Sequence, residues 1–235
     1  EAREEASESA PASGYERLAL GPSVVIVDTG QAPPVAFSSR AHASALAFEF
    51  SSGASRLLVN CGAPYDETSP FAEAARTTAA HNAAVYGDQP SATFASQPAG
   101  GPAPVERSAG PDEVSLIASH DGYAAAGVIH RRRLSLQAGG AVLEGEDEFE
   151  APVDLARDEV AIRFHLMPGT KADHLAGKKG VLLVMPDGQA WRFDAGGLDI
   201  ELEDSIFLAG NTPRRSEQMV VNIILSLTPG VVWRL

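Results

Sequence analysis

Three polar residues between positions 42 and 81 have the types and spacing of a single chemical site. His42 precedes the strand-like run 45–50, Asn60 ends a second apolar run, and His81 precedes a third. Two imidazoles and one oxygen, with a fourth position open, form an arrangement that Zn²⁺ accepts, although a neutral amide oxygen binds transition metals weakly. The alternative is a hydrogen-bonded structural cluster that anchors the ends of the strands.

The only concentrated positive charge is a run of three arginines. Strand alternation predicts that Arg131 and Arg133 point to one face, with His130 and Arg132 on the other. The run could meet a carboxylate or a sulfate. Pairing with the acidic segment 144–150 on a neighbouring strand is the simpler interpretation.

The composition limits the classes of protein to which the chain can belong. Its 235 residues carry a formal charge of -13, which argues against a general nucleic-acid binder because phosphate contacts need clustered Lys and Arg. The single cysteine, Cys61, excludes an intrachain disulfide framework. No apolar run approaches the roughly 18 residues of a membrane helix, so we expect no membrane insertion.

Hydrophobic patterning predicts an all-β fold, an antiparallel two-sheet β-sandwich of about a dozen strands. Turn signals containing Gly separate the strand-like runs, which is typical of antiparallel connections. Residues 1–13 read as an acidic tail or linker, and 14–235 as one domain. One short helical segment is expected over 69–80, and the Gly- and Pro-rich stretch 96–113 is expected to be a surface loop.

Ten segments in register carry a family resemblance. They are SGYERL (13–18), AHASALAFEF (41–50), RLLVNCG (56–62), RTTAAHN (76–82), SHDGY (119–123), HRRRLSL (130–136), GEDEF (145–149), RFHLMPG (163–169), WRF (191–193) and EQMVV (217–221). Together they resemble the C-terminal domain of the heparinase II/III-like polysaccharide lyases. The resemblance implies a β-sandwich that follows an α/α toroid, with a polysaccharide cleft between the two domains.

Members of that family cleave uronic-acid-containing chains, such as glycosaminoglycans, by β-elimination. The reaction needs a group that neutralises the uronate carboxylate, a base for the weakly acidic C5 proton, and an acid for the leaving oxygen. The resemblance also implies work on extracellular polymers, and hence a periplasmic or secreted protein.

Carried over residue by residue, the family pattern changes at its chemical positions. His42 and His81 fall on two zinc-binding histidines, while Asn60 falls on the aspartate that completes the zinc site. Arg40 falls on the catalytic histidine, and Ser44 on an aspartate of the same segment. An arginine stays protonated at working pH, so Arg40 could neutralise a uronate but could not act as an ordinary base.

These substitutions lead to a specific expectation. The chain forms one wall of a cleft for an acidic polysaccharide, with Arg40 and Arg76 as substrate-binding residues and a possible structural zinc on the residues named above. No catalytic residue is assigned. Lyase activity is expected only when the domain is joined to its toroid, in the same protein or on a separate chain. The alternative is a noncatalytic structural or interaction module.

Overall fold

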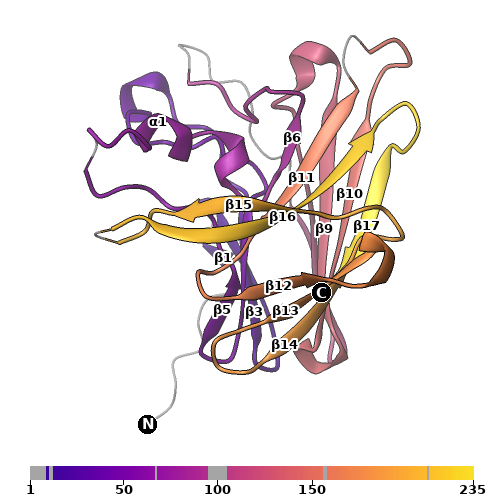
Figure 1. The fold of residues 1–235 in the computed structure, drawn as a ribbon. Coiled ribbons are helices and arrows are strands. Elements are labelled where there is room, and N and C mark those ends of the chain that lie inside the picture. Colours follow the sequence, from indigo (N-terminus) through magenta and orange to yellow (C-terminus); the bar gives the residue numbers. More distant parts are fainter. Residues whose placement is uncertain (1–8, 11–12, 67, 95–104, 156–157, 211) are drawn as a thin grey trace.

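The protein folds as an antiparallel all-β structure, as the sequence predicts. In the computed structural model, the described residues are 9–10, 13–66, 68–94, 105–155, 158–210 and 212–235. Their strands form three sheets of five, eight and four strands, in which every strand pair is antiparallel. In Figure 1 the N-terminal strands β3 and β5 lie on one side, β9, β10 and β17 on the other, and β15 and β16 run across the molecule.

The first sheet supplies the strands on which the candidate site is built. Its strands follow chain order: β1 (Ser9–Ala10), β2 (Tyr15–Leu20), β3 (Ser23–Asp28), β4 (Phe48–Ser52) and β5 (Ser55–Leu58). Strand β1 lies within the segment 1–13, whose first eight residues are outside the described part of the chain. The inward residues of β4 are Phe48 and Phe50, and Glu49 between them faces outward.

The second and third sheets complete the sandwich. The eight-stranded sheet has the order β12 (Lys171–His174), β13 (Gly180–Val184), β14 (Ala190–Asp194), β17 (Gly230–Arg234), β10 (Val142–Glu150), β9 (Ile129–Gln137), β8 (Glu113–His120) and β7 (Glu106–Ala109). The four-stranded sheet has the order β15 (Glu201–Phe207), β16 (Arg214–Ile224), β11 (Glu159–His165) and β6 (Ala84–Tyr86).

In the part of the chain that the structure describes, helical structure is confined to single turns. The expected helix over 69–80 is realised as the α-helix α1 (Ala72–Ala75) and the 3₁₀ turn η2 (Thr78–Ala80). The other 3₁₀ turns are η1 (Val35–Phe37), η3 (Ala124–Ala126), η4 (Ala138–Gly140) and η5 (Ala176–Lys178). No helix among the described residues is long and apolar enough to cross a membrane.

The stretch 96–113, expected to be a loop, contains the edge strand β7. Its four residues pair with β8 although all of them are exposed. Hydrophobic patterning could not reveal this strand, because an exposed edge strand has no buried face. Residues 96–104 of the same stretch lie outside the described part of the chain.

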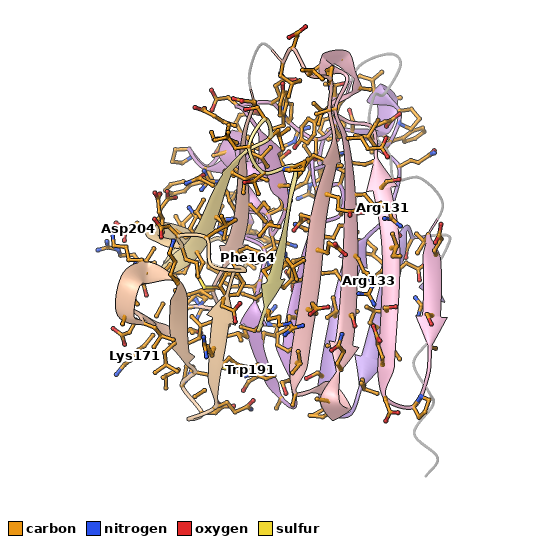
Figure 2. The ribbon with its side chains drawn as sticks, turned by 90° about the vertical axis from the view of Figure 1, so that its right-hand side faces the viewer. Arg131, Arg133, Phe164, Lys171, Trp191 and Asp204 are labelled. Atoms are coloured by element: carbon orange, nitrogen blue, oxygen red, sulfur yellow. The ribbon has the colours of Figure 1, made fainter. Side chains whose placement is uncertain are left out.

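Trp233 joins the three sheets at the centre of the core. Its indole stacks on Phe48 of the first sheet with 5.5 Å between ring centroids, and meets Phe164 of the third sheet edge-on at 4.9 Å. Gly145 makes room for it, since a Cβ at that position would lie 2.0 Å from the indole. Figure 2 shows Phe164 inside the molecule, whereas Arg131 and Arg133 lie along the outward face of β9.

A buried carboxylate lies beside this aromatic core. Asp147 on β10 is fully buried, and its two oxygens accept hydrogen bonds from His130 Nε2, Arg132 Nε and Trp233 Nε1 at 2.7, 2.7 and 2.9 Å. Burial alone would raise the pKa of Asp147, but Arg132 and His130 outweigh burial and hold it below its usual range. The predicted pairing of the arginine run with segment 144–150 is confirmed, and Arg132 makes that pairing inside the core.

Two histidines extend the network in one direction. The Gly122 amide donates to His120 Nδ1 at 3.1 Å, so the proton of the neutral His120 ring is on Nε2, which donates to His130 Nδ1 at 3.0 Å. His130 then donates to Asp147 from Nε2. Burial lowers the pKa of both histidines, which keeps the rings neutral and the direction of the chain fixed.

Replacing Asp147 with Asn is expected to destabilise the fold by about 3–5 kcal/mol, because it leaves the buried Arg132 charge without compensation. Glu148→Gln is the matched control. Glu148 pairs with Arg131 on the outer face, where both side chains are about half exposed, and such pairs contribute less than about 1 kcal/mol. Urea unfolding measures both changes.

A double variant tests the same idea if Asp147→Asn alone does not fold. Arg132→Met combined with Asp147→Asn removes the orphaned charge, so it should recover part of the loss. Equal losses in Asp147→Asn and Glu148→Gln would show that the buried carboxylate is not a structural anchor.

Candidate functional site

Four of the five predicted site residues, Arg40, His42, Asn60 and His81, line one polar pocket at one end of the first sheet. Its volume is about 580 Å³, within the range of roughly 300–1,000 Å³ found for ligand pockets. Strands β2, β3 and β4, the segment after β5, the segment after η2, and the connection between β3 and β4 form its walls. The polar lining includes Tyr15, Asp28, Arg40, His42, Ser44, Glu49, Asn60 and His81.

His42 and His81 meet in this pocket as a hydrogen-bonded pair. His81 Nδ1 donates to the carbonyl of Thr77 at 2.8 Å, so Nε2 of the neutral ring carries a lone pair. That atom lies 3.2 Å from His42 Nδ1, and the two rings meet edge to face. Burial lowers the pKa of His81 to about 4, and burial together with the Arg76 charge lowers that of His42.

Asn60 joins the pocket to the core through Asn82. Its side-chain oxygen accepts a hydrogen bond from the backbone amide of Asn82 at 2.8 Å. The Asn82 side chain donates to the Phe48 carbonyl and accepts from the amide of His165, while the Asn82 carbonyl accepts from Arg132. All four polar groups of Asn82 are therefore paired, and they fix the place of the neighbouring His81.

The two proposed substrate-binding arginines occupy different places. Arg40 is exposed and lines the pocket. Arg76 donates from Nε to the Ala41 carbonyl at 2.9 Å and from Nη2 to the Ser38 carbonyl at 2.8 Å, and it lies over the Phe94 ring. Arg76 thus holds the segment that carries Arg40 and His42, and it is not among the residues that line the pocket.

Sequence reasoning missed three pocket residues, Tyr15, Asp28 and Glu49. Tyr15 and Asp28 are directly opposite each other on β2 and β3, and Glu49 is opposite Ile26 on the next strand. The alternation of these strands could have indicated that the three side chains point outward. It could not have indicated that they line the same pocket. Asp28 Oδ2 accepts a hydrogen bond from Ser44 Oγ at 2.6 Å, so a carboxylate from β3 lies beside the serine.

His42, Asn60 and His81 fit zinc poorly as a set. The separation of the two histidine nitrogens, 3.2 Å, is close to the roughly 3.3 Å that two nitrogen ligands of a tetrahedral zinc show. However, the third donor is a neutral amide whose oxygen already accepts a hydrogen bond. Within the described part of the chain, no three His, Cys, Asp or Glu side chains are grouped so that they could hold a metal ion.

Comparison with known proteins identifies the family. Residues 2–234 match the family described as Heparinase II/III-like, C-terminal. The chain belongs to this family. Its fold also matches the crystal structure of heparan sulfate lyase HepC from Pedobacter heparinus, with a TM-score of 0.78, 11% identity, and coverage of 94% of this chain and 34% of that one. A crystal structure of heparinase III matches with a TM-score of 0.72, 14% identity, and coverage of 94% and 35%.

A curated relative is closer in sequence than these structures. FtsZ-localized protein C from Caulobacter vibrioides is 30% identical over 233 residues, which cover 91% of this chain and 40% of the relative. This heparinase-like domain therefore spans less than half the length of the curated relative it matches, and about a third of the length of the two lyases.

The buried histidines predict a loss of stability in acid. His81 and His165 have a pKa of about 4 in the folded chain, against 6.5 when exposed. As the pH falls from 6.5 toward 4, the unfolded chain binds protons that the folded chain does not, so the free energy of unfolding decreases. A shift of this size corresponds to roughly 3 kcal/mol per histidine.

Urea unfolding at several pH values measures this slope. His81→Asn should make it shallower, because one titrating group is removed, and Asn can still donate toward Thr77. His174→Asn, at an exposed position on β12, is the control variant. The same slope in His81→Asn as in the unsubstituted chain would contradict the lowered pKa of His81 as a cause of the loss of stability in acid.

Proposed function

We propose that this domain is one wall of a binding site for a uronic-acid-containing polysaccharide, and that it does not carry out β-elimination by itself. The observation that carries the proposal is the pocket that Arg40 lines together with a pair of neutral, mutually bonded histidines. A guanidinium can neutralise a uronate carboxylate. A buried imidazole with a pKa of about 4 is a poor base for a C5 proton.

The missing acid and base belong to a second domain in this proposal. The support is the length of the relatives, of which this chain covers 34% to 40%. We propose that an α/α toroid, in the same protein or on a separate chain, forms the opposite wall of the cleft. An exported location, periplasmic or secreted, is part of the same proposal and rests on the family resemblance alone.

Titration with uronate oligosaccharides tests the binding wall. We expect salt-sensitive affinity that falls about tenfold or more in Arg40→Ala, because hydrogen bonds to a charged group contribute roughly 1.5–3 kcal/mol. Arg131→Ala is the control, since Arg131 is an exposed arginine on β9 outside the pocket. Loss of binding in both variants alike, or in neither, would refute the role of Arg40.

A lyase assay of the same chain tests the second half of the proposal. Elimination produces an unsaturated uronate that absorbs in the ultraviolet, and we expect its formation to stay at the uncatalysed rate. Eliminative turnover by this chain without a second domain would overturn the proposal.

A noncatalytic interaction module is the second candidate, and one observation favours it. The curated relative, at 30% identity, is named for its localisation with FtsZ. In this case the His42–His81 pair is a structural clamp, and the binding surface lies elsewhere. Sedimentation of the chain together with purified FtsZ polymers would support this candidate, provided that the Arg40→Ala variant sediments to the same extent. A chain that remains in the supernatant and binds uronates would oppose it.

We further propose that the neutral amide of Asn60 is what keeps zinc from binding strongly. In Asn60→Asp the carboxylate keeps the acceptor for the Asn82 amide and adds the negative charge that the donor set lacks. We expect Asn60→Asp, purified without chelator, to retain about one zinc per chain by elemental analysis, and the unsubstituted chain far less. The control is Asn60→Asp combined with His81→Gln. Stoichiometric zinc in the unsubstituted chain would contradict this proposal.

A further inference from the structure

The pocket has a charge pattern that a plain uronate does not explain. Among the described residues, its lining contains one guanidinium, Arg40, and two carboxylates, Asp28 and Glu49. Arg40 comes from the connection between β3 and β4, whereas the carboxylates stand on the strands themselves. The pocket therefore presents positive charge from one element and negative charge from another.

Within the described part of the chain, the hydrogen bonds to the two carboxylates come from uncharged donors. Asp28 accepts from Ser44 Oγ and from the Gly30 amide, at 2.6 and 3.0 Å. Glu49 Oε1 accepts a hydrogen bond from the backbone amide of Asn60 at 3.1 Å. These bonds orient the carboxylates but do not neutralise them, so a cationic ligand group beside them would be stabilised.

The pKa of the neighbouring Tyr15 is affected by this charge. Asp28 and Glu49 both raise the pKa of Tyr15, which lies across from Asp28. Tyr15 is about half exposed, so its ring is available to a sugar at the rim of the pocket. An added anion would meet the same repulsion, whereas an ammonium group would relieve it.

We propose that the pocket recognises a zwitterionic disaccharide unit, in which a uronate carboxylate meets Arg40 and a free amino group on the adjacent sugar meets Asp28 and Glu49. This inference rests on the proposed function and specifies the chemistry of its ligand. Asp28 and Glu49 are then specificity-determining residues that distinguish the charge on the amino-sugar nitrogen.

Three oligosaccharides of equal length test directly whether the pocket recognises a zwitterionic disaccharide unit. They share one backbone of glucuronate and glucosamine, and the nitrogen is a free amine, an acetamide or a sulfamate. At a pH where the amine is protonated, calorimetric titration should give the tightest binding for the amine and the weakest for the sulfamate. We expect the affinity for the amine to exceed the affinity for the acetamide by about tenfold.

Two charge-matched double variants isolate the cause. Asp28→Asn with Glu49→Gln removes both charges, so the three affinities should converge. The amides keep one oxygen that can accept from Ser44 and one that can accept from Asn60, while the acceptor for the Gly30 amide is lost. Glu148→Gln with Glu150→Gln removes the same charge from exposed positions on β10 and should preserve the order. If the first double variant does not fold, Glu49→Gln alone should narrow the difference.

The outcomes separate this inference from the proposed function. Equal affinity for all three oligosaccharides, or preference for the sulfamate, would overturn the zwitterion assignment and leave the uronate wall intact. Convergence in both double variants would also overturn it, because the effect would then come from net charge. Binding of none of the three would overturn the proposed function itself.

Discussion

The structure depends on the burial of one negative charge. A carboxylate as enclosed as Asp147 is costly unless several donors surround it, and three side chains from two strands donate to it. Satisfying Asp147 fixes Arg132, and Arg132 has hydrogen bonds left to donate. Its Nη1 group reaches the carbonyls of Leu46 and Asn82, which belong to segments far away in the sequence.

Those two carbonyls connect the core to the pocket. Leu46 has a positive φ of 57°, an unusual conformation for a branched side chain, and it lies where the loop bearing His42 enters β4. Asn82 follows His81 and holds Asn60 through its amide. The polar side of the pocket is therefore positioned by bonds that begin at a carboxylate on the opposite sheet. This explains how a site built mainly on connections between strands keeps a defined geometry.

The same architecture accounts for a fold shared with lyases at 11% to 14% identity. Alternating apolar residues and a packed aromatic centre specify the sandwich, and many sequences satisfy that pattern. The chemistry of the pocket is independent of it. The family resemblance predicts that Arg40 replaces a catalytic histidine and that Ser44 and Asn60 replace aspartates. Replacements of this kind alter the charge and basicity of a site without changing the inward residues that specify the strands.

The sequence by itself determined the all-β class, the antiparallel pairing, the family, and the alternation that separates Arg132 from Arg131 and Arg133. These follow from local periodicity and turn chemistry, which are written in consecutive residues. Only the tertiary structure decided that Arg76 holds a loop while Arg40 lines the pocket, that Asp28 stands beside Ser44, and that Glu49 shares the pocket with them. Such contacts join strands through side-chain direction and loop path, and neither the spacing nor the type of the residues encodes which polar groups will meet.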